Sequence, residues 1–330
     1  MSNTKGRIAI LTSGGDAPGM NAAIRAVVRA GIAKNYEVYG VVHGYNGILN
    51  REIKKLDFKD VSEKIQHGGT FLFTARSSEF RPMEGKMKAA EICHELGIEH
   101  LVVIGGDGSF TGAKNLSKFG VNIIGLPGTI DLDIAYTEYT IGFDTAVNTA
   151  MEAIDKLRET SNSHDRCSVV EVMGRSAGYI ALWCGIANGA EEILLPEKFD
   201  YDYERLFAQI KRNKEAGMTH QIIVNAEGVG HSYELAERIE AATGIETRAT
   251  VLGHVQRGGT PTARDRYYAS IMGAYAVDII DQGKKSRLVG YKNGKVYDVD
   301  IMEAFAMTKS IDEYEYTVAE TLANRPSLDS

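Results

Sequence analysis

The 330-residue sequence has only three cysteines, no long apolar run and no excess of positive charge. The cysteines, Cys93, Cys167 and Cys184, are odd in number and far apart, which argues against a disulfide framework and predicts a cytoplasmic location. No apolar run reaches the length of a membrane span, and the short one at the amino terminus ends in Gly-Gly-Asp, which favours a first strand over a signal peptide. The net charge of −7 gives no overall attraction to nucleic acid, so an anionic ligand must be bound by local arginine clusters.

Glycine is abundant, with 35 residues, and it falls at the ends of short apolar runs that are followed by helix-like periodicity. The runs are RIAILTSGG (7–15), HLVVIGGDGS (100–109), NIIGLPG (122–128), SVVEVMGR (168–175), EILLPE (192–197) and QIIVNAEG (221–228). Continuous β-branched runs that alternate with helices predict buried parallel strands and a doubly wound α/β fold. In such sheets ligands bind at the carboxyl ends of the strands, where the glycines and acidic residues lie here.

Two of the glycine-rich junctions resemble phosphate-binding loops. SGGDAPGMN (13–21) has Walker-A glycine spacing, but Met20 stands where the lysine should be, so this is no P-loop. A strand–glycine–helix junction still points free N–H groups at an anion, although a plain tight turn explains the segment equally well. In GGDGS (105–109), Asp107 could hold Mg²⁺ beside phosphate oxygens. With GTIDLD (128–133), the two junctions indicate a triphosphate, a metal and an acid–base residue in one cleft.

Several arginines lie close to glycines, and guanidinium groups suit phosphate oxygens. They are Arg76, Arg81, Arg166, Arg175, Arg248 and Arg257. Most arginines are solvated surface groups, and Arg257, between a glutamine and Gly-Gly, fits that interpretation least well.

One motif favours another class of enzyme. GRSAG (174–178) matches the nucleophile elbow of hydrolases, with Ser176 as nucleophile and His254 as base. Short glycine patterns arise easily in a glycine-rich chain, no HGGG-type oxyanion loop accompanies the motif, and the carboxylate–metal pattern would be left unexplained. We therefore rank a serine hydrolase below a kinase, and replacing Ser176 by alanine separates the two.

Taken together, LTSGGDAPGMNAAIR, VVIGGDGS, GLPGTID, EVMGR and ATVLGHVQRGG resemble the bacterial ATP-dependent 6-phosphofructokinase family, in order over nearly the whole chain. The resemblance implies phosphoryl transfer from MgATP to the 1-hydroxyl of fructose 6-phosphate by a homotetramer. It also implies two Rossmann-like, three-layer α/β domains. We expect a larger ATP-binding domain from 1–141 plus 255–305, and a smaller sugar-phosphate-binding domain from 142–254 plus 306–330. No proline- or serine-rich linker marks the boundary.

The resemblance also implies roles for single residues. Asp131 is expected to take the proton of the sugar hydroxyl, with Thr129 beside it, and Arg175 to meet transition-state charge. The residues expected to bind ATP are Gly15, Arg76, Ser77, Gly106, Asp107, Gly108 and Ser109, with Asp107 serving Mg²⁺. Those expected to bind the sugar phosphate are Thr129, Ile130, Asp131, Arg166, Met173, Gly174, Arg175, Glu227, Arg248, His254, Val255, Gln256 and Arg257. Arg166 and Arg248 would reach in from a neighbouring subunit.

Two glycines indicate which compound donates the phosphoryl group. Pyrophosphate-using relatives place an acid after the GGD motif and a lysine before the TID motif, where this chain has Gly108 and Gly128. Because small residues leave room for the rest of a nucleotide, we expect ATP as the donor.

Three positions near the active site depart from the family pattern. Leu132 replaces the asparagine of GTIDNDI, and we expect its side chain to point away from Asp131 and Asp133 by strand-like alternation, and to pack. Ser77 and Ser78 stand where an aromatic residue near the adenine and a proline are usual, which predicts weaker or looser nucleotide binding. Tyr179 replaces an aspartate, a change for which the sequence offers no firm explanation.

The fourth departure concerns regulation. The family's effector site for ADP, GDP or phosphoenolpyruvate is matched at Arg25, Arg29, Arg158, Gly189, Glu191 and His220. However, Phe58 replaces a third arginine, and Ala216 and Met218 replace basic residues, so we expect weak or absent effector control. The sequence also leaves open a catalytically impaired family member that acts as a binding or regulatory subunit, although all residues with direct chemical roles are kept.

Overall fold

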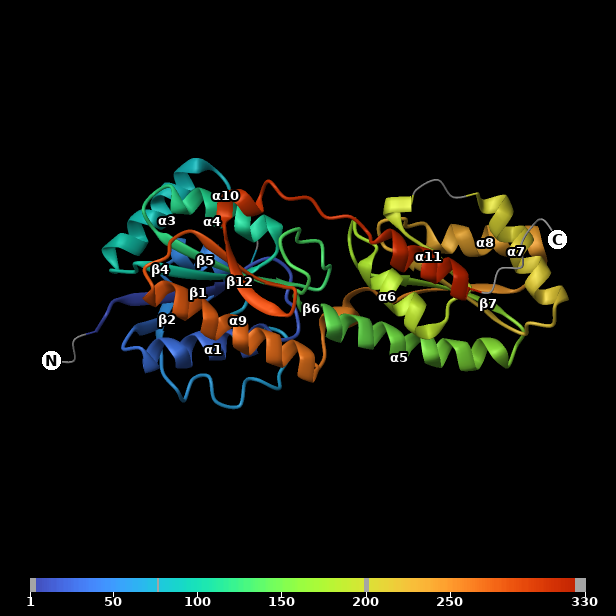
Figure 1. Ribbon diagram of the computed structural model, residues 1–330, viewed down its shortest axis with the longest axis horizontal. Helices are drawn as coiled ribbons and strands as arrows, with labels where there is room; N and C mark the ends of the chain where they lie inside the picture. The colour runs from blue at the N-terminus through green and yellow to red at the C-terminus, as the bar shows by residue number, and fades with distance from the viewer. Residues whose placement is uncertain (1–3, 76, 199–201, 324–330) are drawn as a thin grey trace. The chain divides into compact units, whose positions relative to one another are not determined.

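The computed structural model describes residues 4–75, 77–198 and 202–323. The chain forms two compact units, which Figure 1 shows. Unit 1 contains the described residues up to Ile130, then Ile134–Thr145 and Arg257–Lys309. Unit 2 contains Asp131–Asp133, Ala146–Gln256 and the described residues from Ser310. The domain boundaries expected from the sequence, and the ligand roles of the two domains, stay predictions.

Unit 1 is built on an eight-stranded, mostly parallel sheet with the order β12-β11-β5-β4-β1-β2-β3, in which β6 pairs with β5. The strands are β1 (Arg7–Thr12), β2 (Glu37–Val41), β3 (Ile53–Leu56), β4 (His100–Gly105), β5 (Asn122–Thr129), β6 (Ile141–Gly142), β11 (Arg287–Lys292) and β12 (Lys295–Asp300). Only β3 and β12 are antiparallel to their neighbours among these strands. Every residue of β5 is buried, because a parallel strand covered on both faces must be apolar along its whole length.

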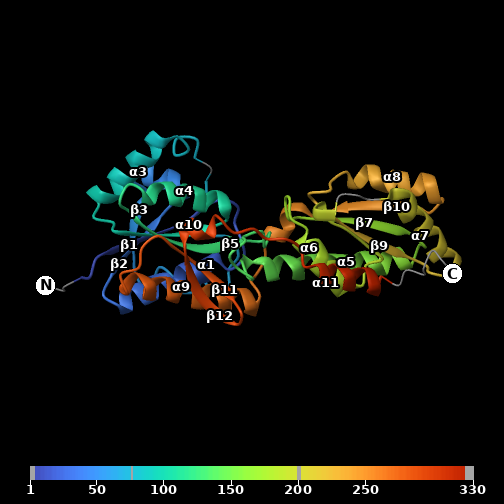
Figure 2. The ribbon, with the colours of Figure 1, turned by 45° about the horizontal axis from the view of Figure 1, so that its top comes forward.

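Helices cover both faces of this sheet (Figures 1 and 2). They are α1 (Met20–Ala33), α2 (Gly44–Leu49), α3 (Met83–Glu95), α4 (Asp107–Ser117), α9 (Ala263–Asp281) and α10 (Ile301–Ala304). α1 and α9 pack against each other on one face, while α3 and α4 pack together on the other.

Unit 2 has a smaller, fully parallel sheet with the order β10-β7-β9-β8. Its strands are β7 (Cys167–Val172), β8 (Glu192–Leu194), β9 (Gln221–Ala226) and β10 (Thr247–Val251). The helices are α5 (Phe143–Asn162), which begins in unit 1, α6 (Tyr179–Asn188), α7 (Tyr203–Glu215), α8 (Ser232–Thr243) and α11 (Glu313–Leu322), with 3₁₀ turns at Pro196–Lys198 and Gly253–Arg257. α7 and α8 pack together on one face, and α6 and α11 on the other. The prediction of two doubly wound α/β domains is confirmed.

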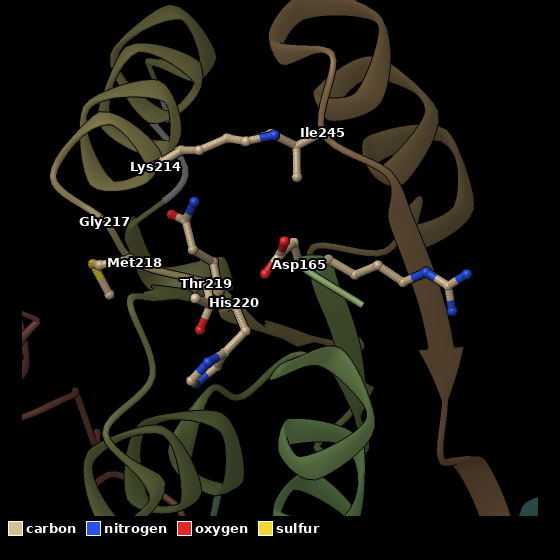
Figure 3. A pocket seen from close by; sticks show the side chains of 9 residues that line it. Asp165, Lys214, Gly217, Met218, Thr219, His220 and Ile245 are labelled. Carbon is tan, nitrogen blue, oxygen red and sulfur yellow. The ribbon is translucent and has the colours of Figure 1, made fainter. Parts of the chain in front are cut away.

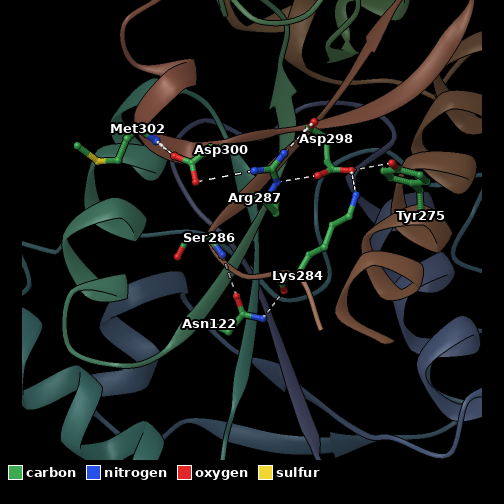
Figure 4. Close-up of polar contacts among 8 residues, drawn as sticks. All are labelled: Asn122, Tyr275, Lys284, Ser286, Arg287, Asp298, Asp300 and Met302. Carbon is green, nitrogen blue, oxygen red and sulfur yellow. Dashed lines mark hydrogen bonds and ion pairs between the residues drawn. The ribbon is translucent and has the colours of Figure 1, made fainter. Parts of the chain in front are cut away.

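A buried carboxylate holds the β11–β12 hairpin in unit 1 (Figure 4). Asp298 accepts hydrogen bonds from Lys284 Nζ (2.8 Å), Arg287 Nε (2.6 Å) and the Tyr275 hydroxyl (2.7 Å). Burial alone would raise the pKa of Asp298, but these donors hold it below its ordinary value. Asn122 of β5 completes the connection, since its side chain binds the backbone of Lys284 and Ser286.

The three cysteines are free thiols inside the fold. Cys93, Cys167 and Cys184 are buried and unpaired, and burial raises the pKa of each thiol to about 12. Such thiols are inert, because the thiolate is the reactive form. In the described part of the chain, no helix has both the length and the apolar character needed to cross a membrane.

Candidate active site

The two glycine-rich junctions of unit 1 meet at the carboxyl ends of β1 and β4. Ser13 N donates to Ile104 O (3.0 Å), so the chains leave the sheet side by side. A Cβ atom on Gly105 would lie 2.5 Å from both Ser13 O and Ser109 Oγ, and one on Gly14 would lie 3.4 Å from Ser109 Oγ. Only glycine allows this approach of two backbones. The structure thus brings together the segments of the predicted ATP-binding residues Gly15, Gly106 and Ser109.

The second junction opens directly into α4, whose first residue is Asp107. Ser109 N and Phe110 N donate to Gly106 O (2.9 and 3.1 Å), which forms the first turn at the edge of the sheet. The first N–H groups of a helix favour an anion such as phosphate. Asp107 and Gly108 are both exposed there, so the surface combines anion-binding amides with one carboxylate.

The residues present fit a magnesium ion that a nucleotide carries. Among the described residues, no group of three or more histidine, cysteine or acidic side chains could hold a metal. Mg²⁺ bound with phosphates needs only one or two carboxylates, because phosphate oxygens and waters fill its other positions. The exposed carboxylate of Asp107 at the start of α4 meets that requirement.

The two glycines used to infer the donor differ in their surroundings. At Gly108, an added Cβ atom would meet nothing within 4 Å, so this position is open, as the argument for a nucleotide requires. At Gly128, the added atom would lie 2.7 Å from Ile104 Cγ2 and 3.1 Å from Met20 Cε. Gly128 is therefore required by packing between β5, β4 and α1, and leaves no open space.

Arg257 lies against the first glycine loop. Its Nη1 donates to Asp16 O (3.2 Å), and a Cβ atom on Gly15 would lie 2.5 Å from the same nitrogen. A residue predicted to bind the sugar phosphate therefore contacts the loop that was predicted to bind ATP. The partner was missed in the sequence because the contact is to a backbone carbonyl, which no side-chain motif reveals.

Two further residues of the predicted ATP set lie in the segment before α3. Arg76 lies outside the described residues. Ser77 Oγ donates to Asn46 Oδ1 (3.4 Å) and accepts from Phe80 N (3.1 Å). The hydroxyl of Ser77 therefore connects its loop to α2, which contains Asn46.

The predicted catalytic loop leaves the sheet at Thr129, the last residue of β5. Asp131 and Leu132 are both buried, with 3% and 5% exposure. Leu132 has a φ of 55°, in the left-handed region. The expected strand-like alternation is therefore wrong, because the chain has left the extended conformation before Leu132. The expected packing of the leucine is confirmed by its burial. Asparagine enters the left-handed region more readily than leucine, so backbone conformation explains the family's usual residue.

Substitutions at Leu132 test this backbone conformation. Leu132→Gly and Leu132→Ala remove nearly the same packing, but only glycine adopts a positive φ without strain. We expect the glycine variant to be the more stable by about 1 kcal/mol, measured by denaturant unfolding. An alanine variant of equal or higher stability would contradict the left-handed assignment.

The turn that follows β7 in unit 2 is held by two side chains from the predicted substrate set. Glu227 Oε2 accepts from Gly174 N (3.2 Å) and Arg175 N (2.9 Å), and Gln256 Oε1 accepts from Met173 N (2.8 Å). Arg175 is exposed and has a φ of 56°, which is strained for a residue other than glycine. Glu227 and Gln256 therefore fix the conformation in which Arg175 is presented.

The remaining predicted substrate residues of unit 2 lie on its surface. His254 and Val255, in the 3₁₀ turn Gly253–Arg257, are exposed. Arg166 Nε lies 2.8 Å from Glu246 Oε2, and Arg248 Nη2 lies 2.5 Å from Glu246 Oε1. The pKa of Glu246 is lowered, mainly by Arg166. Glu246 was missed in the sequence; it directly precedes β10, two residues before Arg248.

The hydrolase alternative gains no support. Ser176 follows β7 and precedes α6, as an elbow would, and both Ser176 and His254 are exposed. Within the described residues, no hydrogen bond joins the Ser176 hydroxyl to His254, and a nucleophile needs a base within such a distance.

Tyr179 begins α6, and its side chain is 8% exposed. Its pKa is raised to about 12, chiefly by burial and then by the nearby charges of Glu197, Asp133 and Glu315. A neutral phenol avoids adding a further negative charge beside these three acids. The structure thus gives a physical reason to tolerate tyrosine where the family usually has aspartate.

The predicted effector residues form one group in each unit. In unit 2, Arg158 donates to Asn188 O (2.7 Å) and Gly189 O (3.1 Å), contacts His220 Nε2 (3.0 Å), and lies 3.7 Å from Glu191. In unit 1, Arg25 and Arg29 lie on α1, and burial followed by the charge of Arg29 lowers the pKa of Arg25. The Arg29 guanidinium lies 5.6 Å from the centre of the Phe58 ring.

A cavity of about 200 Å³ lies beside His220 at the amino ends of β7 and β9 (Figure 3). Its lining residues are Asp165, Arg166, Lys214, Gly217, Met218, Thr219, His220, Gln221 and Ile245. Arg166 of the predicted substrate set and His220 of the predicted effector set both line this cavity. Met218 also lines it, at a position where the family usually has a basic residue.

The fold and the site define an α/β protein of the class that binds phosphate groups. The sheet is mostly parallel, and glycine-rich junctions and the N-terminus of α4 lie at the carboxyl ends of its strands. The family model described as phosphofructokinase matches residues 7–280. The chain belongs to the phosphofructokinase family.

Individual relatives agree with the family match. A Clostridium botulinum (strain Hall) protein named ATP-dependent 6-phosphofructokinase is 58% identical over 96% of this chain and 99% of its own length. A Clostridium perfringens (strain 13) protein, named ATP-dependent 6-phosphofructokinase 1, is 57% identical with the same coverage. The structure of phosphofructokinase from Saccharomyces cerevisiae is 37% identical with a TM-score of 0.85, over 97% of this chain. This chain spans 48% of that yeast chain.

Proposed function

We propose that this chain catalyses phosphoryl transfer from MgATP to the 1-hydroxyl of fructose 6-phosphate, giving fructose 1,6-bisphosphate and ADP. The observation that carries the proposal is the 58% identity, over 96% of the chain, to a relative named ATP-dependent 6-phosphofructokinase. The open space at Gly108, where pyrophosphate-using relatives carry an acid, supports ATP as the donor.

The predicted residues would divide the chemistry among them. The amides at the start of α4 and the loop at Gly15 would bind the phosphates of ATP, and Asp107 would hold its magnesium. Bound Mg²⁺ neutralises charge on the transferring phosphate oxygens. Arg175, fixed by Glu227, would stabilise negative charge in the transition state. Asp131 would accept the proton of the sugar hydroxyl.

A coupled assay with fructose 6-phosphate tests the proposal by comparing ATP with pyrophosphate as donor. Turnover with ATP and little with pyrophosphate is expected. The reverse preference would refute the donor assignment. Absence of turnover with either donor would favour the alternative, an impaired family member that acts as a binding or regulatory subunit. None of the comparisons favours that alternative.

A cytoplasmic homotetramer, in which Arg166 and Arg248 act on a neighbouring subunit, is part of the proposal. Glu246 supports it, because one carboxylate holds both guanidinium groups on the same surface of unit 2. The three inert, buried thiols suit a reducing compartment.

Control by anionic effectors is expected to be weak or absent. Phe58 and Met218 replace cationic groups, and Arg158 is already bonded to two backbone carbonyls. Each missing charged hydrogen bond to a phosphate removes about 1.5–3 kcal/mol of binding free energy. Sub-millimolar phosphoenolpyruvate should therefore leave the fructose 6-phosphate saturation curve unchanged. A clear shift of that curve would overturn the expectation.

A further inference from the structure

An exposed aromatic ring lies beside the first glycine loop of unit 1. Phe73 is 57% exposed. Its carbonyl accepts from Thr12 Oγ1 (2.8 Å) at the end of β1, and the next residue, Thr74, donates through Oγ1 to Gly14 O (2.7 Å). The backbone of Phe73 is thereby tied to the loop proposed to bind the phosphates of ATP.

The phenyl ring of Phe73 is also supported by a neighbouring side chain. Phe73 stacks on His43, with ring centroids 5.2 Å apart and planes inclined by 24°. His43 is fixed in turn, since its Nδ1 lies 2.7 Å from Glu52 Oε2 and its backbone N–H donates to Leu72 O (2.8 Å). One face of the phenyl ring is therefore covered by imidazole, while more than half of the side chain stays open.

The backbone at both residues is strained. Phe73 has a φ of 55° and His43 a φ of 64°, a region that residues with side chains rarely adopt. An exposed phenyl ring gains little burial to offset such a conformation. Strain that persists at the edge of a binding loop indicates a functional constraint more often than a packing one.

In the described residues of the loop that follows, 74–75 and 77–82, the aromatic side chain is Phe80, which is buried and stacks on Tyr45. Ser77, where the family usually has an aromatic residue, uses its hydroxyl to bond Asn46 of α2 and Phe80 N of its own loop. An aromatic face gains about 1–3 kcal/mol of free energy by stacking on a nucleobase.

We propose that Phe73, supported by His43, is the platform on which the base of the nucleotide donor stacks. This inference rests on the proposed function, since it requires a nucleotide whose phosphates occupy the Gly14–Gly15 loop. It makes Phe73 a determinant of donor specificity, because pyrophosphate has no base to stack.

Calorimetric titration of the full chain with MgATP and with magnesium tripolyphosphate, which lacks the base, tests the proposal. Phe73→Ala is expected to raise the Kd of ATP roughly 5- to 150-fold and to leave the Kd of tripolyphosphate unchanged. Phe73→Trp should bind ATP as the wild type does. Tyr233→Ala, which removes another exposed aromatic ring (65% exposed) from unit 2, should change neither Kd.

The other outcomes separate the two hypotheses. If Phe73→Ala binds ATP like the wild type, the stacking role is refuted while the kinase function stands. Equal weakening of ATP and tripolyphosphate would also refute stacking, because it would mean that Phe73 acts only through the shape of the phosphate loop. If the wild type binds neither ligand, the proposed function fails first and the stacking role fails with it.

Discussion

The Asp131→Ser variant is expected to lose kcat by roughly 10²- to 10⁴-fold while binding both substrates almost as the wild type does. A positioned general base contributes about this factor to proton transfer. Asp131 directly follows the end of β5 and is 3% exposed, so its carboxylate is held by the fold and shielded from water. Steady-state kinetics gives kcat, and calorimetric titration of ATP and fructose 6-phosphate gives the two affinities.

Two controls sharpen this prediction. Asp131→Asn keeps the volume of the side chain but cannot accept the proton, so it should lose as much activity as the serine variant. Thermal unfolding of both variants should show a folded protein, since the change is confined to one side chain. Rates close to the wild type in either variant would refute the role of Asp131 as the base.

Much of the fold could be predicted from where apolar runs meet glycine. Each run overlaps one strand of the structure, and in most runs the strand ends before or at the glycine, as β4 ends at Gly105 and β7 ends before Gly174, whereas β5 continues to Thr129 and the run of β8 has no glycine. The reason is physical, because a buried parallel strand must be apolar along its length, while the turn after it needs residues without a Cβ atom. The helix-like periodicity that follows the first run is present as α1 (Met20–Ala33).

The hairpin of β11 and β12 was missed, although the sequence carries a signal for it. Asn293 and Gly294 both have a positive φ, as the favoured two-residue hairpin turn requires, and Asn-Gly is its commonest sequence. The buried Asp298 that anchors this hairpin could not be predicted, because its partners Lys284 and Tyr275 are brought to it by the tertiary fold.

The sequence also could not predict the backbone conformations of Leu132, Arg175 and Phe73. All three have a positive φ, and none belongs to a residue type that favours it. Such conformations persist only because surrounding contacts hold them, as Glu227 holds the turn at Arg175. A pattern of residue types records local preference, so it predicts the opposite conformation at these positions.

A buried carboxylate fixes the start of α5, the helix that continues from unit 1 into unit 2. Asp265 is fully buried and accepts from Gly142 N (2.7 Å), Thr145 N (2.8 Å), and the hydroxyls of Thr145 and Tyr139. Burial raises the pKa of Asp265, and these hydrogen bonds oppose the shift. Asp265 thus acts as the N-terminal cap that α5 would otherwise take from its own sequence.

Asp265→Ala is therefore expected to lower the free energy of unfolding by about 3–5 kcal/mol, because it leaves several buried donors unpaired at about 1–3 kcal/mol each. Denaturant unfolding followed by circular dichroism measures the loss. Asp278→Ala provides the matched control on the same helix, since the carboxylate of Asp278 is 47% exposed and pairs only with Lys34 (3.1 Å) among the described ion pairs. An exposed pair contributes at most about 1 kcal/mol. Equal losses in the two variants would contradict the capping role, whereas a selective loss at Asp265 would identify it as the residue that anchors α5.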